Sequence, residues 1–571
     1  MTGNAREPRA DGKYRVSLVS QVWSEPGRTA AAVAAWVAAA AAEGADLVAL
    51  PQECIQTAGE PIPGPASQAL ADLARRHQVW LIGNLRERAG GRNYLTSLLF
   101  DRAGRLAGRY RKSHKLPDED IDLGDELPVF ETELGRVALR IGTDRHFPDI
   151  DHVYALQGAD FIFWAQAPEP IEDEYLQDAP AIGRALDYRV MIACARYAGS
   201  TPYFLPGNFP PYRGCPVGRS WLIDRDGQRL ACTARIGGGV ATATVEPRRA
   251  PEFRCRPDSN PAFALLTQPV QPPPARNYPR RRIRLTLVEG DLGIDEIDER
   301  LDQAGRLGSD LVGLYEFEWI TAHGPRPASE VLERQTADAA ERLRRIAARA
   351  RDHAMYVVVA GVIRRRERNE ALIFDRSGEL LGVYTKIRTT YAEQVIGQET
   401  PVFETDFGRI AVRICADEGC PELERCYSLL GADIVLSPSQ SWSPDPVTRD
   451  QRDCARAMDG GFFLLETTHP SSAARHRSRI IDPCGVVIAR SAHHRAGLVT
   501  AEVDLDRDRP LRAIRKWRPA PPIPFEDHPS WPTVSYPDEL PETANDLQET
   551  IRRQRRPELY GALKQVAAAV Q

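Results

Sequence analysis

Three side chains in the second half of this 571-residue sequence could do covalent chemistry together: Cys415, Glu316 and Lys386. An alternating apolar run at 409–414 predicts a strand that leads straight into Cys415. Pro421, with acidic residues beside it, predicts that a helix begins shortly afterwards. At such a junction, backbone N–H groups and the helix dipole can activate a thiol and hold an oxyanion. A lone cysteine is more often a buried structural residue, so the interpretation depends on the other two side chains.

Glu316 and Lys386 both follow predicted strands. Glu316 ends the apolar run 311–315, and Lys386 ends the strand that leaves a turn at Gly378. Strand ends of one sheet gather at one edge, where active sites are commonly built. There the carboxylate can take the thiol proton, the thiolate can attack a carbonyl or nitrile carbon, and the ammonium can stabilise the developing anion. One charged residue at a strand end is usually only solvated, but three together favour nucleophilic catalysis.

The chain contains an internal repeat, because residues 92–165 align with residues 368–438 almost without gaps. Both copies contain Pro-Val-Phe-Glu-Thr, at 128–132 and at 401–405. Between and after the copies the chain is rich in proline, as linkers often are. The predicted parts are a tail at 1–12, a first domain at 13–250, a linker at 251–282, a second domain at 283–506 and a Pro-rich, then helical tail at 507–571.

Each half alternates apolar strand runs with helical segments, which predicts a layered α/β architecture. The alanine-rich segment at 29–42 is too short to span a membrane and is interpreted as a helix packed on a sheet. The closing helical run, 542–570, is expected to pack on the body of the protein or on a neighbouring subunit.

The composition is that of a soluble globular protein. A net charge of -5, with 42% hydrophobic and 27% charged residues, gives no reason to expect nucleic acid or a membrane as partner. Ten scattered cysteines and a polar segment from Met1 to Lys13 favour a cytoplasmic protein with reduced thiols. Cys415, Cys420 and Cys426 lack the paired spacing or histidine cluster of a metal site, so no metal is expected.

With these motifs the sequence resembles the nitrilase, or carbon–nitrogen hydrolase, superfamily. The resemblance rests on Glu316 after a strand, Lys386 in Tyr-Thr-Lys, and Cys415 in Ile-Cys-Ala-Asp followed by Pro-Glu. It implies a Glu-Lys-Cys triad and a second glutamate after the lysine, for which Glu393 ahead of Gly397 is the matching residue. It also implies that no metal or organic cofactor is needed.

The same resemblance covers both halves and implies two tandem αββα-sandwich domains. Subunits of this family pair through helices, so a tandem chain is expected to form that pair within itself as an internal pseudo-dimer. A larger homo-oligomer remains open. The closing segment 555–560, Arg-Arg-Pro-Glu-Leu-Tyr, also resembles C-terminal tails of the family.

The first half lacks the nucleophile. Its matching segment, 140–149, has Gly142 at the position of Cys415. Glycine has no side chain that can attack a substrate, so acyl transfer by this mechanism is excluded there. Asp144 or His146 could support another role, although a scaffold remnant is the simpler interpretation.

The other site positions of the first half are altered to different degrees. Counting along the repeat places Gln52 at the position of Glu316, and the neighbouring Glu53 leaves open whether a carboxylate is displaced or absent. Lys112 and Glu119 are retained. We therefore expect one live site and one vestigial half that supplies packing.

The residues after the nucleophile bear on the substrate. Cys415-Ala416-Asp417 resembles the amidase and carbamoyl-hydrolase branches, which favours an amide or N-carbamoyl substrate over a nitrile. Attack by Cys415 would release ammonia or an amine and leave a thioester for water to hydrolyse. A non-catalytic binding or regulatory protein is the alternative, and it is disfavoured because all four expected catalytic residues are present together.

Overall fold

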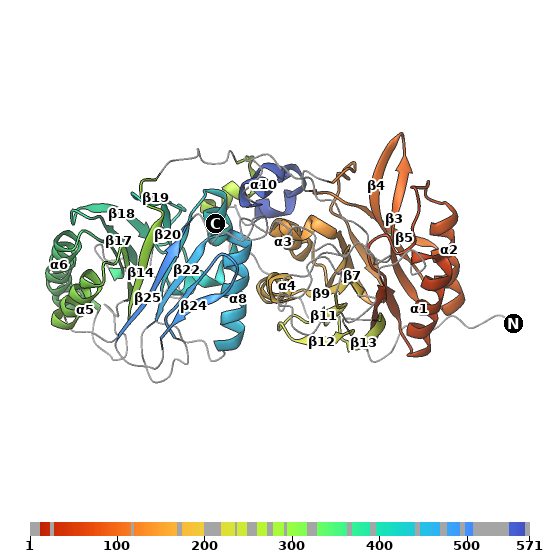
Figure 1. Ribbon diagram of the computed structural model, residues 1–571, viewed down its shortest axis with the longest axis horizontal. Helices are drawn as coiled ribbons and strands as arrows, with labels where there is room; N and C mark the ends of the chain where they lie inside the picture. Colours follow the sequence, from red (N-terminus) through yellow and green to blue (C-terminus); the bar gives the residue numbers. More distant parts are fainter. Residues whose placement is uncertain are drawn as a thin grey trace, which may run out of the picture. The chain divides into compact units, whose positions relative to one another are not determined.

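The chain folds into two compact units. In the first are Met1–Pro257 and Gln554–Lys564, and in the second are Asp258–Arg553 and Gln565–Gln571 (Figure 1). The C-terminal segment 554–564 is therefore part of the first unit, which confirms that this tail packs on the body of the protein. The computed structural model describes residues 12–22, 28–115, 119–167, 174–198, 218–234, 237–247, 260–270, 278–289, 294–316, 328–362, 368–388, 395–439, 446–468, 477–491, 497–505 and 547–565.

Two sheets form the centre of the first unit. The larger has the order β10-β1-β2-β3-β4-β5, with β13 paired to β1, and the smaller has the order β12-β11-β9-β8-β7-β6. The strands of the larger sheet are β1 (Tyr14–Val22), β2 (Leu47–Ala49), β3 (Trp80–Ala89), β4 (Arg92–Phe100), β5 (Leu106–Arg111), β10 (Tyr197–Ala198) and β13 (Gly239–Val245). Those of the smaller sheet are β6 (Val129–Thr132), β7 (Gly135–Ile141), β8 (Phe161–Ala165), β9 (Met191–Ala195), β11 (Trp221–Ile223) and β12 (Arg229–Cys232).

The second unit repeats this plan. Its sheets have the orders β18-β17-β16-β15-β14-β25 and β19-β20-β21-β22-β23-β24. The strands of the first of these sheets are β14 (Arg282–Glu289), β15 (Leu311–Glu316), β16 (Tyr356–Val362), β17 (Glu370–Phe374), β18 (Leu380–Thr385) and β25 (Gly497–Asp504). Those of the second are β19 (Phe403–Glu404), β20 (Arg409–Val412), β21 (Ile434–Ser439), β22 (Phe463–Thr468), β23 (Arg479–Ile481) and β24 (Val487–Arg490).

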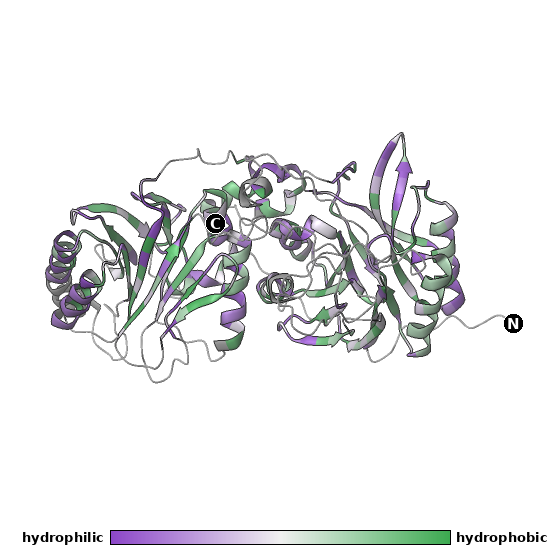
Figure 2. Cartoon of the chain, in the orientation of Figure 1, coloured by the Kyte–Doolittle hydropathy of each residue, from purple (hydrophilic) through white to green (hydrophobic). Residues whose placement is uncertain are grey.

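Helices cover the outer faces of the sheets in both units, and the apolar strands lie between them (Figure 2). In the first unit these are α1 (Ala30–Ala42), α2 (Pro65–His77), α3 (Pro148–Leu156) and α4 (Glu174–Tyr188). In the second they are α5 (Ile294–Arg306), α6 (Ala328–Asp352), α7 (Pro421–Leu429) and α8 (Pro446–Gly460), and α10 (Leu547–Gln554) precedes the C-terminal segment. The predicted α/β class, with two tandem αββα sandwiches, is confirmed. The predicted internal pseudo-dimer stays a prediction.

Helix α1, which is rich in alanine, is capped at its first turn and packs one face against the sheet. Thr29 caps its first turn by accepting a hydrogen bond from the N–H of Ala32 at 3.2 Å. Val33, Val37 and Ala40 recur at helical spacing and are fully buried in the core against the sheet. No helix among the described residues is long and apolar enough to cross a membrane.

Parallel pairing puts the ends of the central strands on one edge. In the second unit β14, β15 and β16 run parallel to one another, as do β20, β21 and β22. Their apolar residues are buried on both faces, as parallel strands covered by helices require. Side chains that follow β15 and β20 therefore meet at the carboxyl edges of these two packed sheets. The prediction that the three strand ends belong to one sheet was wrong, because β15 and β18 lie in one sheet and β20 in the other.

Candidate active site

Glu316 is the last residue of β15 and is buried, with 5% of its surface exposed. Its Oε1 accepts two hydrogen bonds, from Asn369 Nδ2 at 2.9 Å and from Lys386 Nζ at 3.0 Å. A buried carboxylate needs such donors, because ionisation in a low-dielectric site is otherwise costly. The structure thus brings two of the predicted residues into direct contact and adds Asn369, which the sequence had shown only as part of the repeat.

Lys386 follows β18 and is nearly as buried as its partner, at 9% exposure. Burial by itself would lower the pKa of this ammonium. The negative charges of Glu316, Cys415 and Asp417 outweigh it and raise the pKa of Lys386 to about 12. Lys386 is therefore a fixed cation at neutral pH, and it lies close enough to Cys415 for the two groups to interact electrostatically.

Cys415 lies in a sharp turn. It follows the strand residue Ile414, has a φ of +44° and begins a short 3-10 helix, η5 (Cys415–Gly419), which precedes α7. The predicted strand, turn and helix at Pro421 are confirmed, but the 3-10 helix intervenes between nucleophile and helix. A left-handed conformation is unusual for a residue with a Cβ, and such conformations concentrate at functional sites. Cys415 is partly exposed, as the role of nucleophile predicted for it requires.

Asp417 holds this turn against the end of the lysine strand. One carboxylate oxygen accepts the N–H of Ile414 at 2.8 Å and the hydroxyl of Tyr384 at 2.7 Å. The other accepts the N–H groups of Ile387 at 3.2 Å and Arg388 at 2.8 Å. Burial raises the pKa of Asp417 to about 6, although the charge of a nearby lysine opposes the shift. Asp417 thus connects the nucleophile turn to the two residues that follow Lys386.

The backbone after Lys386 is braced by a segment that precedes the second sandwich. The N–H of Gly397 donates to the carbonyl of Lys386 at 2.8 Å, and the carbonyl of Gly397 accepts from Asn260 Nδ2 at 2.9 Å. Asn260 also caps the 3-10 helix η4 (Pro261–Thr267) by accepting the N–H of Ala262 at 2.9 Å. Part of the predicted linker is therefore built into the second unit. Glu393 lies outside the described residues.

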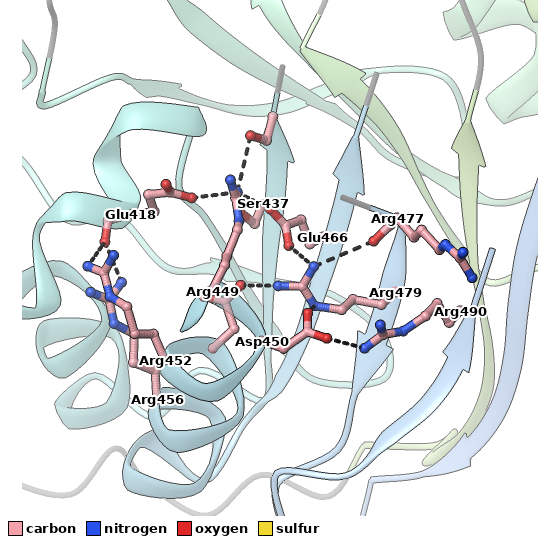
Figure 3. Close-up of polar contacts among 12 residues, drawn as sticks. Glu418, Ser437, Arg449, Asp450, Arg452, Arg456, Glu466, Arg477, Arg479 and Arg490 are labelled. Carbon is pink, nitrogen blue, oxygen red and sulfur yellow. Dashed lines mark hydrogen bonds and ion pairs between the residues drawn. The ribbon is translucent and has the colours of Figure 1, made fainter. Parts of the chain in front are cut away.

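A row of charged side chains extends from Glu418 in η5 to Arg479 on β23 (Figure 3). Arg449, on α8, contacts Glu418 in the turn and Glu466 on β22. Arg479, on β23, continues the row by pairing with Glu466 at 2.7 Å and Asp453 at 2.6 Å. Buried ion pairs need such mutual satisfaction, since an unpaired charge would be costly. These ion pairs connect η5 to α8, β22 and β23.

The first unit has different residues at the positions that correspond to this row of charged side chains. Ser437, Glu466 and Arg479 are neighbours across β21, β22 and β23. Trp164, Cys194 and Trp221 are neighbours across β8, β9 and β11, the corresponding strands. Glu466 and Arg479 of the second unit thus correspond to Cys194 and Trp221 of the first, and apolar patterning alone did not reveal this difference in charge.

The first unit keeps the backbone of the site without the nucleophile. Gly142 begins a matching 3-10 helix, η2 (Gly142–His146), and has a φ of +51°, close to that of Cys415. Lys112 is fully buried and contacts Glu119. Glu53 turns away to pair with Arg86 at 2.6 Å, so no carboxylate from this pair of residues replaces the one missing at Gln52.

Comparison with known proteins gives consistent results. The carbon-nitrogen hydrolase family model matches residues 15–254 and 287–513, which confirms the tandem duplication. A probable nitrilase of Schizosaccharomyces pombe is 31% identical over 151 residues, 25% of this chain and 56% of that protein, so the match spans little more than half of that relative. The omega-amidase NIT2 of Homo sapiens is 29% identical over 211 residues, 32% of this chain and 74% of that protein. An amidase structure from Nesterenkonia sp. aligns with 42% of this chain and 98% of its own, at 21% identity and a TM-score of 0.35.

Proposed function

Because the chain belongs to the carbon-nitrogen hydrolase family, we propose that its second unit hydrolyses the amide bond of a small molecule through Cys415. One observation carries the proposal: a buried Glu316–Lys386 pair stands beside a partly exposed cysteine in a left-handed turn. Carboxylate, ammonium and thiol are the three groups that acyl transfer to sulfur needs.

In the first half-reaction Glu316 takes the proton of the Cys415 thiol, and Sγ attacks the carbonyl carbon of the amide. The oxygen becomes an oxyanion, which the ammonium of Lys386 stabilises; its raised pKa keeps it protonated throughout. The backbone N–H of Ala416 is a second donor for this oxygen. Collapse of the intermediate breaks the carbon–nitrogen bond, and the proton held by Glu316 passes to the leaving nitrogen.

In the second half-reaction water attacks the thioester. Glu316, ionised again, accepts a proton from that water, and a second oxyanion forms beside Lys386. Collapse breaks the carbon–sulfur bond, and the thiolate of Cys415 regains its proton from Glu316. The products are a carboxylic acid and ammonia or an amine.

Glu393 is proposed as a further member of the site. Its counterpart in the repeat, Glu119, contacts Lys112 in the first unit. By the same geometry Glu393 would pair with Lys386 and orient the ammonium toward the oxyanion. A Glu393→Gln variant should lower kcat more than it raises KM.

An amide is the favoured substrate class, because the omega-amidase and amidase relatives bear that activity in their names. An N-carbamoyl compound can follow the same path, since its carbonyl carbon also bears a leaving nitrogen. A nitrile is the remaining alternative within the family.

The proposal is tested by measuring ammonia release from a panel of primary amides, N-carbamoyl compounds and nitriles. Release is expected with the intact protein and lost in Cys415→Ala. The matched control is Cys420→Ala, which removes a buried thiol five residues away that belongs to no proposed step. Release that persists in Cys415→Ala would refute the nucleophile, and no release from any class by the intact protein would favour a binding function.

A further inference from the structure

We propose that the first unit holds a second, non-catalytic site at Gly142, which binds a neutral primary carboxamide without hydrolysing it. This goes beyond the hydrolase activity proposed for the second unit. It rests on polar groups that the first unit keeps around a position that has no nucleophile.

Two polar side chains converge on the place where a nucleophile would begin. A Cβ built on Gly142 would lie 2.6 Å from Gln52 Oε1 and 3.4 Å from Lys112 Nζ. The left-handed φ of +51° keeps the backbone in the form that Cys415 adopts in the second unit. The backbone conformation of the turn has therefore been retained, while Gln52 Oε1 lies in the space that a side chain at this position would need.

Gln52 supplies a buried acceptor that none of the described residues satisfies. It is 7% exposed, and its Oε1 has no hydrogen-bond partner among the described residues. Its backbone is nonetheless fixed, because its carbonyl accepts the hydroxyl of Tyr197 at 2.7 Å. The corresponding Glu316 accepts two hydrogen bonds from Asn369 and Lys386. Leaving a buried acceptor unpaired is costly, so a ligand N–H that reaches Gln52 would recover that free energy.

A second buried amide lies next to the first. Gln166, 1% exposed, follows β8, and its carbonyl accepts the N–H of Gln52 at 3.3 Å. Neither side-chain polar atom of Gln166 has a hydrogen-bond partner within the described part of the chain. The corresponding residue of the second unit, Ser439, accepts a hydrogen bond from Arg449 at 3.3 Å. Buried side-chain amides without hydrogen-bond partners are unusual in a protein core. Gln52 and Gln166 therefore indicate that a polar ligand binds at this edge of the sheets.

The charges of Lys112 and Glu119 at this edge favour a neutral ligand. Lys112 is fully buried, and its positive charge is matched by the contacting carboxylate of Glu119. Its ammonium also donates to Thr143 Oγ1 at 2.7 Å, which leaves a third proton. A carboxylate ligand would meet a lysine already neutralised and an amide oxygen that repels it. A primary carboxamide fits both groups, since its NH2 can donate to Gln52 Oε1 and its oxygen can accept from Lys112 Nζ.

The test uses the full chain with Cys415→Ala, so that no ligand is turned over, and titration calorimetry with propionamide. A second variant adds Gln52→Leu, which keeps the size of the side chain and removes the unpaired oxygen. Because an apolar replacement relieves an unsatisfied buried group, this variant is expected to fold with an unfolding midpoint no lower than its parent. The matched control adds Glu53→Gln at the next residue, whose side chain pairs with Arg86 instead.

Gln52→Leu is expected to remove one equivalent of bound propionamide, or to weaken that site at least tenfold, while Glu53→Gln leaves the titration unchanged. Identical titrations with and without Gln52→Leu would overturn the proposal, whatever the second unit binds. Equal loss in the control would overturn the assignment to Gln52. Propionate that binds this site as tightly as propionamide would overturn the ligand class.

Discussion

Asn260 lies outside the second sandwich in sequence, yet its removal should impair the proposed active site. Asn260→Ala removes a hydrogen bond to the carbonyl of Gly397 and the cap on η4. A lost cap costs about 1 kcal/mol, and a carbonyl left unpaired in the interior costs roughly 1–3 kcal/mol. Because Asn260 is 3% exposed, water does not easily replace it. The free energy of unfolding should therefore fall by about 2–4 kcal/mol.

The effect on catalysis follows from the next hydrogen bond. Gly397 donates to the carbonyl of Lys386 at 2.8 Å, so a shift of Gly397 moves the backbone that carries the ammonium. Misplacement of a catalytic group by about 1 Å can cost on the order of 100-fold in rate. A partial shift should lower kcat for amide hydrolysis by about tenfold, with KM less affected because the ammonium acts mainly on the oxyanion.

Two further variants separate positioning from stability. Asn260→Asp keeps the acceptor that caps η4 but replaces the donor to Gly397, so it should lose activity as Asn260→Ala does. Thr267→Ala removes the hydroxyl at the other end of η4, which donates to Ala264 O at 3.0 Å, and should leave kcat unchanged. Chemical denaturation and steady-state kinetics measure both quantities. Asn260→Ala with reduced stability and unchanged kcat would refute the positioning role.

Three other changes test the electrostatics of the two units. Asp417, whose pKa burial raises from 3.8 to about 6, contributes stability below pH 4 that is lost as the pH rises through 6. Asp417→Asn should remove about 3 kcal/mol of this pH dependence, so the thermal unfolding midpoint should vary less between pH 4 and 7 than in the intact protein. A variant whose midpoint changes with pH as much as that of the intact protein would contradict the raised pKa. Arg449→Met removes the arginine that pairs with Glu418 and one of the two arginines that pair with Glu466. It should lower the free energy of unfolding by roughly 3 kcal/mol in denaturant titrations, and an unchanged free energy would contradict a stabilising role for these ion pairs. Gln52→Glu with Gly142→Cys, placed in Cys415→Ala, should restore weak ammonia release, since lysine and glutamate are already in contact there; none would show that the first unit lacks more than these two groups.

Local sequence patterns predicted the elements of each sandwich well, because apolar runs and helix starts are local signals. Helix α7 begins at Pro421, as the proline and its acidic neighbours predicted. The contact between Glu316 and Lys386 was also predictable, since residues at parallel strand ends converge. Counting along the repeat placed Gln52, and the structure puts it against Gly142.

The remaining features depend on contacts between distant segments. Asn260 bonds a residue 137 positions away, and nothing in its surrounding sequence names that partner. The C-terminal Tyr560 likewise bonds His114, 446 positions away, so its place in the first unit was open. Asp417 was visible in the Cys-Ala-Asp motif, but the motif does not reveal which backbone N–H groups donate hydrogen bonds to its carboxylate.

A comparison of Gly142 with Cys415 shows which features of this turn the fold requires and which it does not. Both place a residue at φ near +50° between a strand and a 3-10 helix, and the first unit fills this position with glycine. Glycine adopts that conformation without steric cost, whereas a residue with a Cβ is strained by roughly 1 kcal/mol. The turn itself is thus compatible with the less strained residue, as Gly142 demonstrates within the same chain. Cys415 occupies the strained position beside a buried carboxylate and ammonium, and packing alone does not account for that choice. The acyl transfer proposed above would account for it, and Asp417 holds the turn in this conformation by accepting the N–H of Ile414.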